Sequence, residues 1–169
     1  MKQIGVLPDD ILLGIFGSYV DMSQFEPYES VAFYEDIEAW QSLVHVCQRW
    51  RNLVFESPRR LNLQLFCTPE TPAKDTLDIW PALPLIVFGR VTLSSGTDNV
   101  MAALGESNRV CQVNLDLADW QLEEVLAAMQ VPFPGLTDLR LFSGGETPPA
   151  IPNSFLSGSA LPHVCESSF

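Results

Sequence analysis

The chain has 169 residues, of which 47% are hydrophobic and 18% charged, a composition typical of packed globular proteins and not of disordered chains. Its formal net charge is -12, which disfavours binding to nucleic acid or to an anionic membrane surface, because both attract Lys and Arg. No apolar run approaches the ~18 residues that span a bilayer. We therefore expect protein partners, with no nucleic acid and no membrane among them.

The beginning of the chain shows no secretory signal. Residues 1–10 contain one basic residue, Lys2, followed by a proline and two aspartates, where a signal would have a basic stretch leading into a long apolar run. We therefore expect an intracellular protein, in the cytoplasm, the nucleus or both. The cysteines are scattered and form no CxxC pair, which favours reduced thiols over a zinc site or a disulfide framework. They are Cys47, Cys67, Cys111 and Cys165.

A first helix is predicted to begin at Pro8, since proline suits the first helical position and Asp9 and Asp10 favour the positive end of a helix dipole. Apolar residues then recur as adjacent pairs every four positions, which keeps them on one face at 3.6 residues per turn. They are Ile11, Leu12, Ile15, Phe16, Tyr19 and Val20. We expect this face to be buried.

The next segment, residues 21–38, contains six acids and no base and is predicted to be a solvated loop. Helical periodicity resumes over residues 37–54, where apolar positions alternate with polar ones at helical spacing. Two short helices are predicted there, divided near Val46 or Cys47.

Ser57-Pro58 ends the helical part, because a proline disfavours the helical state in the residue before it. Beyond it, pairs of apolar residues are separated by one polar residue, as in a half-buried strand. Such strands are predicted at residues 61–65, 91–93, 113–115 and 139–141. Their starts are separated by 22 to 30 residues, close to the ~20 to 29 residues of a leucine-rich repeat.

Helical stretches are predicted between the later strands, at residues 100–104 and 121–129, so that strand, connection and helix form a repeating unit. We expect an α+β or α/β fold. A short helical module occupies residues 1–57, and a small leucine-rich-repeat-like solenoid occupies residues 58–169.

Two segments of the helical module together resemble the F-box. They are Leu7-Pro8-x-x-Ile11-Leu12-x-x-Ile15-Phe16 and Trp40-x-x-Leu43-Val44-x-Val46-Cys47-x-x-Trp50-Arg51-x-Leu53. With the repeat-like segment that follows, the chain resembles the F-box proteins with degenerate leucine-rich repeats that are abundant in mushroom-forming fungi. The loop at residues 21–38 is longer than the usual link between the first two F-box helices.

This resemblance implies a substrate receptor of a Skp-cullin-F-box ubiquitin ligase, which makes no bonds itself and needs no cofactor. Its helices would dock on a Skp-type adaptor protein and reach a cullin scaffold through it. The adaptor-binding residues that it implies are Leu7, Pro8, Ile11, Leu12, Ile15, Val44, Cys47, Trp50 and Leu53. One alternative is a leucine-rich-repeat binding module whose F-box-like start engages no ligase. Another is a truncated gene product, since no LxL strand follows residue 156.

The predicted strands also indicate where a protein target would bind. In an LxL strand the two apolar residues face the core, so the residues between and beside them point to the opposite, concave face. These residues are polar and mostly uncharged, which suits hydrogen-bonded recognition of a protein segment. They are Asn62, Gln64, Thr92, Gln112, Asn114, Asp138 and Arg140.

Other polar groups are better explained by solvation and capping than by catalysis or metal binding. His45 and Cys47 are two residues apart, which points them to different sides of a helix. Neighbouring carboxylates at residues 9–10, 35–36 and 123–124 have no histidine, glycine elbow or phosphate loop beside them. A small basic cluster suits an acidic adaptor surface better than nucleic acid, since no basic stripe accompanies it. It consists of Arg49, Arg51, Arg59 and Arg60. We expect no catalytic and no metal-binding residues.

Overall fold

The structure is a computed structural model. It describes residues 7–23, 39–70, 72–92, 94–144 and 150–158. The chain divides into two compact units, Met1–Gln64 (unit 1) and Leu65–Phe169 (unit 2). The predicted loop at residues 21–38 lies mostly outside the described residues, as does the segment after residue 158.

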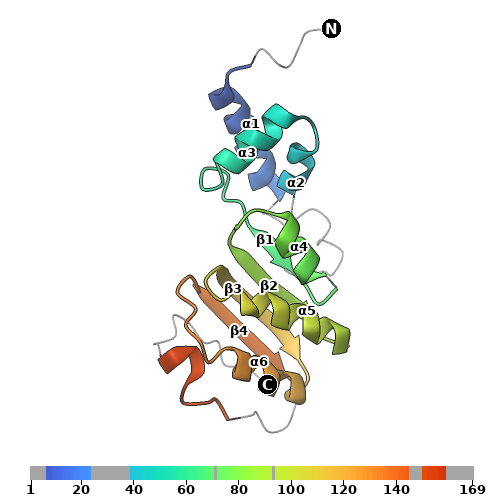
Figure 1. The fold of residues 1–169 in the computed structure, drawn as a ribbon, viewed down its shortest axis with the longest axis vertical. Coiled ribbons are helices and arrows are strands. Elements are labelled where there is room, and N and C mark those ends of the chain that lie inside the picture. Colours follow the sequence, from blue (N-terminus) through green and yellow to red (C-terminus); the bar gives the residue numbers. More distant parts are fainter. Residues whose placement is uncertain (1–6, 24–38, 71, 93, 145–149, 159–169) are drawn as a thin grey trace. The chain divides into compact units, whose positions relative to one another are not determined.

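Unit 1 contains three helices, labelled in Figure 1. They are α1 (Asp9–Ser23), α2 (Ala39–Val44) and α3 (Gln48–Glu56). The carbonyl of Pro8 accepts hydrogen bonds from the backbone N–H groups of Ile11 and Leu12, both at 3.1 Å, and so starts α1 as predicted. The prediction of two short helices divided near residues 46 and 47 is confirmed.

Aromatic rings form much of the core of unit 1. The rings of Phe16 on α1 and Trp50 on α3 lie 4.7 Å apart, which joins these two helices by an aromatic contact. Trp40 on α2 is buried, lies edge-on to Phe55 at 6.2 Å, and donates a hydrogen bond from its indole nitrogen to the Gln64 carbonyl at 3.1 Å. That bond satisfies the one polar atom of a buried indole.

The strand predicted at residues 61–65 is wrong over most of its length. The chain forms a turn up to Asn62, whose φ of 47° places it in the left-handed region, which interrupts an extended strand. The Leu63 N–H donates back to the Pro58 carbonyl at 2.9 Å, as in a closed turn and not in a strand ladder. The first strand, β1 (Leu65–Cys67), begins only beyond this turn.

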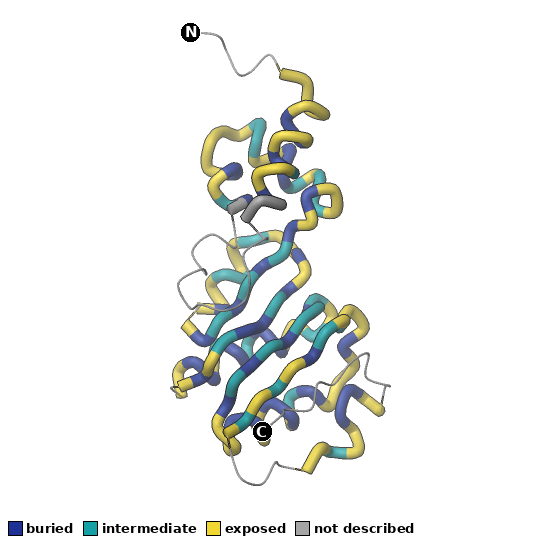
Figure 2. Tube along the Cα trace, turned by 180° about the vertical axis from the view of Figure 1, so that it is seen from behind, coloured by how far each residue is buried: buried dark blue, intermediate teal, exposed yellow. Residues whose placement is uncertain are grey.

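Unit 2 is a four-stranded parallel sheet in the order β1-β2-β3-β4. Figures 1 and 2 show its helices gathered on one face of the sheet. The further strands are β2 (Leu85–Arg90), β3 (Val110–Leu117) and β4 (Asp138–Ser143). The helices are α4 (Ala73–Ile79), α5 (Ser94–Gly105) and α6 (Asp119–Ala128), followed by a 3-10 turn, η3 (Phe155–Gly158). Alternating helix and strand around a parallel sheet is an α/β arrangement.

Two of the predicted strands are confirmed, since β3 contains residues 113–115 and β4 contains residues 139–141. The strand predicted at residues 91–93 is wrong, because the strand of this repeat is β2, which ends at Arg90; Leu93 lies outside the described residues. A continuous apolar run from Leu85 to Phe88, between a proline and a glycine, is the signal that locates β2. The helices predicted at residues 100–104 and 121–129 correspond to α5 and α6, whereas α4 was not predicted.

The spacing between paired residues is shorter for the first two strands of unit 2 than for the later ones. Leu65 pairs with Leu85, 20 residues later, and Gln112 on β3 pairs with Asp138 on β4, 26 residues later. Between β2 and β3 the register shifts by one residue at Cys111, whose thiol donates to the Leu85 carbonyl at 3.2 Å. Beyond that shift, partners on β2, β3 and β4 are 26 residues apart, so only these last repeats have a constant length.

The core of unit 2 lies between the sheet and its helices. Alternate strand residues are fully or nearly buried there, against apolar side chains of α5 and α6. One polar pair is buried with them: Gln121 donates to the Thr97 hydroxyl at 3.2 Å and accepts from the Ala118 N–H at 2.9 Å. Because both ends of the Gln121 amide have partners, its burial carries little desolvation penalty.

Pro69, in the connection after β1, contacts two glycines. A Cβ at Gly89 would lie 2.8 Å from Cδ of Pro69, and a Cβ at Gly96 would lie 2.9 Å from its Cβ. Asn99 fixes the same segment by donating to the Pro69 carbonyl at 2.8 Å. Gly89 also has a φ of 130°, a conformation that side chains strongly disfavour. Close packing of this connection therefore depends on glycine.

We predict that Gly89→Ala lowers the free energy of unfolding by about 1–3 kcal/mol, because it adds both a steric clash and backbone strain. Urea denaturation measures the effect. Gly105→Ala is the matched control, since a Cβ at Gly105 meets no atom within 4 Å. Equal stability of the two variants would contradict the role given to Pro69.

Candidate functional site

The apolar side chains of α1 fall on two sides of the helix. Leu12, Phe16 and Val20 are buried in unit 1. Ile11, Ile15 and Tyr19, here called the α1 stripe, are 53%, 52% and 46% exposed. Four-residue spacing aligns these three side chains along one line of the helix surface. Unit 1 itself therefore buries only half of the apolar face predicted from the sequence.

Two arginines from later in the chain form ion pairs with the first turn of α1. One guanidinium nitrogen of Arg49 lies 2.6 Å from the Asp9 carboxylate and 2.6 Å from the Leu7 carbonyl. Arg60 pairs with Asp10 at 3.3 Å. Such exposed ion pairs contribute little to stability, so their main effect is to orient the residues that precede the α1 stripe.

A shallow depression of about 360 Å³ lies beside this ion pair in unit 1. It is lined by Asp9, Gln48, Arg49, Asn52, Leu53 and Glu56. Its lining is almost entirely polar and presents carboxylates, amides and one guanidinium. Arg51, from the same basic cluster, instead donates to the Val44 carbonyl at 3.0 Å and so satisfies the end of α2.

The predicted adaptor-binding residues have different positions in unit 1. Leu12, Val44 and Leu53 are only 1%, 1% and 8% exposed, so they belong to the core of unit 1 and not to its surface. Trp50 is partly exposed. The exposed members are Leu7, Pro8, Ile11, Ile15 and Cys47. Two exposed apolar residues, Tyr19 and Val46, were not included in the predicted set; for Tyr19 the four-residue spacing after Ile15 was the available signal.

The face of the sheet opposite the helices, here called the open face, is the second candidate surface. Figure 2 shows it from behind, with buried and part-exposed residues alternating along the strands. Because paired residues of neighbouring strands lie side by side, the side chains of the open face form rows across the sheet. The rows are Phe66, Ile86, Gln112 and Asp138, then Phe88, Asn114 and Arg140, then Arg90, Asp116 and Phe142.

In the first two rows of the open face, apolar residues lie on the β1 and β2 side and polar residues on the β3 and β4 side. The third row is reversed, with Arg90 on β2 and Phe142 on β4. On the β1 and β2 side, the rings of Phe66 and Phe88 meet edge to face at 5.7 Å. On the β3 and β4 side, Arg140 pairs with Asp138 at 3.2 Å. Arg90 reaches from β2 to Asp116 on β3 at 2.6 Å. The described charges of the open face thus occur as opposite pairs.

Four of the predicted target-binding residues lie in strands on the open face: Gln112, Asn114, Asp138 and Arg140. The other three lie outside the strands. Asn62 and Gln64 precede β1 and belong to unit 1, because the turn at Asn62 replaces the predicted strand. Thr92 follows the end of β2.

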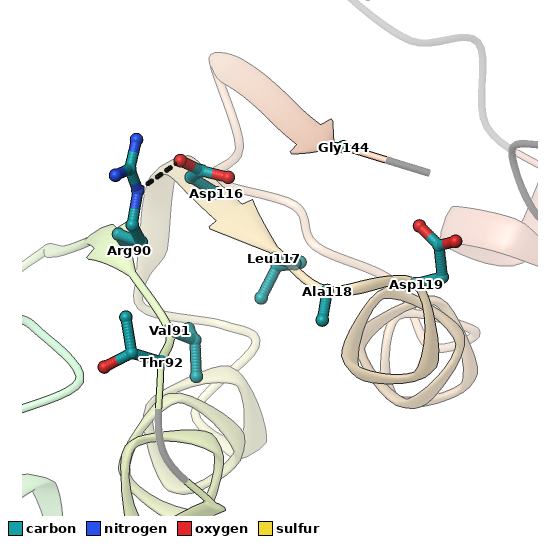
Figure 3. Close-up of a pocket in the computed structure, with 8 residues that line it drawn as sticks. All are labelled: Arg90, Val91, Thr92, Asp116, Leu117, Ala118, Asp119 and Gly144. Carbon is teal, nitrogen blue, oxygen red and sulfur yellow. Dashed lines mark hydrogen bonds and ion pairs between the residues drawn. The ribbon is translucent and has the colours of Figure 1, made fainter. Parts of the chain in front are cut away.

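Thr92 instead lines an open depression of about 570 Å³ at the carboxyl ends of β2, β3 and β4, drawn in Figure 3. Its polar lining includes Arg90, Asp116 and Asp119. Asp116 pairs with Arg90, and Asp119 accepts a hydrogen bond from the Ser143 hydroxyl. Both carboxylates therefore already have donors from the protein itself.

The three described cysteines differ in their surroundings. Burial raises the pKa of the Cys111 thiol above its ordinary value of 9.0, against a smaller opposing effect of backbone hydrogen bonds. A raised pKa keeps this thiol protonated, as its donation to Leu85 requires. Cys47 is exposed and Cys67 is buried, and neither forms a disulfide within the described residues. No group of three or more potential metal ligands is found among the described residues.

We predict that Leu12→Ala lowers the free energy of unfolding by about 2–5 kcal/mol, as expected for a cavity in a core. Ile15→Ala, on the exposed side of the same helix, should change it by no more than about 0.5 kcal/mol. Urea denaturation of the two variants measures the difference. A comparable loss in both would show that the α1 stripe belongs to the core.

No helix in the described ranges has the length and apolar character needed to cross a membrane. Comparison with known proteins gives no match to a family model, to a curated protein or to a solved structure.

Proposed function

We propose that the chain is a substrate receptor of a Skp-cullin-F-box type ubiquitin ligase, in which unit 1 binds a Skp-type adaptor and unit 2 holds a protein target. The observation that carries this proposal is the α1 stripe, a line of half-exposed large apolar side chains on a helix. In this role the chain makes no bonds itself and serves to bring the target to the ligase.

Burial of the α1 stripe would favour association. Fully burying a side chain of the size of Ile contributes about 1.5–3 kcal/mol, and Ile11 and Ile15 each still expose about half of their surface. Leu7 is also 38% exposed and lies just before the same helix. A contiguous apolar surface of this kind marks a protein interface more often than scattered exposed residues do.

The hydrogen bonds of Arg49 support the same interpretation. By binding the Asp9 carboxylate and the Leu7 carbonyl, Arg49 fixes the start of α1 on α3. The residues Leu7 and Pro8 are thereby held next to the stripe instead of being left as a free end. A preorganised surface loses less entropy on binding than one that must first be ordered.

The architecture of unit 2 supports the role of a leucine-rich-repeat-like target holder. Its strands are in sequence order, its later repeats have a 26-residue register, and its helices lie on one face. Repeats of about 20–29 residues with one strand each are the pattern of such solenoids. The open face then offers a strand-lined surface for a target.

A second candidate function is a protein-binding module whose helical start binds no ligase adaptor. The packing of unit 1 favours it: Trp40, Phe16 and Val54 already form a buried core without any partner. In that case the target surface of unit 2 is unchanged. Only the partner of the α1 stripe differs between the two functions.

We predict that Ile11→Glu combined with Ile15→Glu abolishes copurification with a coexpressed Skp-type adaptor, because two carboxylates would have to be desolvated in the interface. Since both side chains point to solvent, the variant should retain its helical circular dichroism and its melting temperature. Ile79→Glu is the matched control, at a 71% exposed isoleucine of unit 2, and should retain the adaptor.

Failure of the unmodified chain to retain any Skp-type adaptor would reject the ligase function and favour the second candidate. Retention of the adaptor by the double variant would instead keep the ligase function but place its interface away from the α1 stripe. A loss of adaptor in the Ile79→Glu control would contradict the separation of the two surfaces.

A further inference from the structure

Two side-chain amides at the centre of the open face have hydrogen-bonding groups to spare. Gln112 and Asn114 lie on β3, between β2 and β4, and are partly exposed. Neither side chain forms a hydrogen bond within the described part of the chain. Their polar neighbours Asp116 and Asp138 are already paired with arginines. The amides are thus the polar groups of this face best able to bind something else.

The spacing of these amides matches an extended peptide. Residues two apart on a strand point to the same side and repeat at about 6.6 Å, and the peptide groups on one side of any extended segment repeat at the same distance. Each carboxamide has both a donor and an acceptor, so each can pair with the N–H and C=O of one residue. A helical partner offers no such groups along its length, because they are bonded within the helix.

The residues on either side of the amides differ in character. Toward β2, Gln112 has Ile86 beside it and Asn114 has Phe88 beside it. Toward β4, the neighbours are Asp138 and Arg140. Side chains of an extended segment alternate between its two sides. A segment over β3 would therefore direct alternate side chains toward an apolar strip and toward a charged one.

Charge restricts the segment further. Among the residues of unit 2 that the structure describes, ten are Asp or Glu and four are Lys or Arg. Because the described charges on the open face pair with one another, the surrounding excess of acids decides the net field. That field repels an acidic segment and attracts a neutral or basic one.

We infer that the open face binds a non-acidic segment of the target in extended conformation, lying along β3 with its backbone bonded to Gln112 and Asn114. Every second side chain of the segment is apolar and contacts the β2 side. This inference rests on the proposed function, in which unit 2 holds the target, and it specifies the kind of segment that is held.

The test uses a phage-displayed library of random dodecapeptides, selected on the full-length chain. Enriched peptides should alternate apolar and polar residues and lack Asp and Glu. Their affinity, measured by fluorescence anisotropy, should fall tenfold or more in the Gln112→Ala, Asn114→Ala variant, because each lost carboxamide removes both a donor and an acceptor for the peptide backbone. Glu123→Ala with Glu124→Ala, on the exposed side of α6, is the control and should bind normally.

A second measurement does not depend on altering the protein. Each backbone nitrogen of an enriched peptide is methylated in turn, which removes one donor at a time. An extended segment bonded on one side should lose affinity at every second position. Losses at nearly every interior position would indicate a helical peptide, whose N–H groups are all bonded within the helix, and would overturn the inference.

Two further results would also overturn it: peptides that bind the amide variant as well as the unmodified chain, or a selection that enriches no peptide. Copurification of the amide variant with the adaptor separates this test from that of the proposed function. An unmodified chain that binds peptides but no adaptor would reject the ligase function and leave the peptide site standing.

Discussion

Each crossover in unit 2 passes over the same face of the sheet and moves the chain by one strand. Parallel strands require such long connections, and here the described helices all cover the same face of the sheet. The buried face supplies the core. Side chains of the open face can therefore be polar without loss of packing, as Gln112, Asn114 and Arg140 are. Strand order never reverses, so the crevice in which doubly wound sheets bind cofactors does not arise within this sheet.

In unit 1 the core is formed between three helices, around buried aromatic residues. Trp40 and Phe16 occupy the centre and fix which side of α1 turns inward. With that side turned inward, Ile11 and Ile15 project from the helix at a different angle and stay about half exposed in unit 1. The same geometry that completes the core thus creates the α1 stripe.

Much of the fold could be predicted from the sequence. Periodicity identified α1 and the strands at Leu139 and Val113, and Ser57-Pro58 indicated the end of the helices. The predictions were wrong or incomplete where one sequence pattern is compatible with two different structures. Alternating leucines before β1 are typical of a strand, yet Asn62 turns the chain there. Likewise, an apolar pair every four residues could not show which member of each pair is buried, since that depends on tertiary packing around Phe16. The ion pairs of Arg49 and Arg90 join residues distant in sequence and have no local signal.

The ring of Pro69 lies against glycines from two different elements, one in β2 and one in α5. These three positions therefore do not contribute to stability independently. A smaller residue at position 69 would make room for a side chain at position 89 or 96, although the positive φ of Gly89 would still disfavour one there. The stability lost on adding a methyl group at Gly96 therefore depends on which residue occupies position 69. Any redesign of the connection after β1 must treat proline and glycines as one unit.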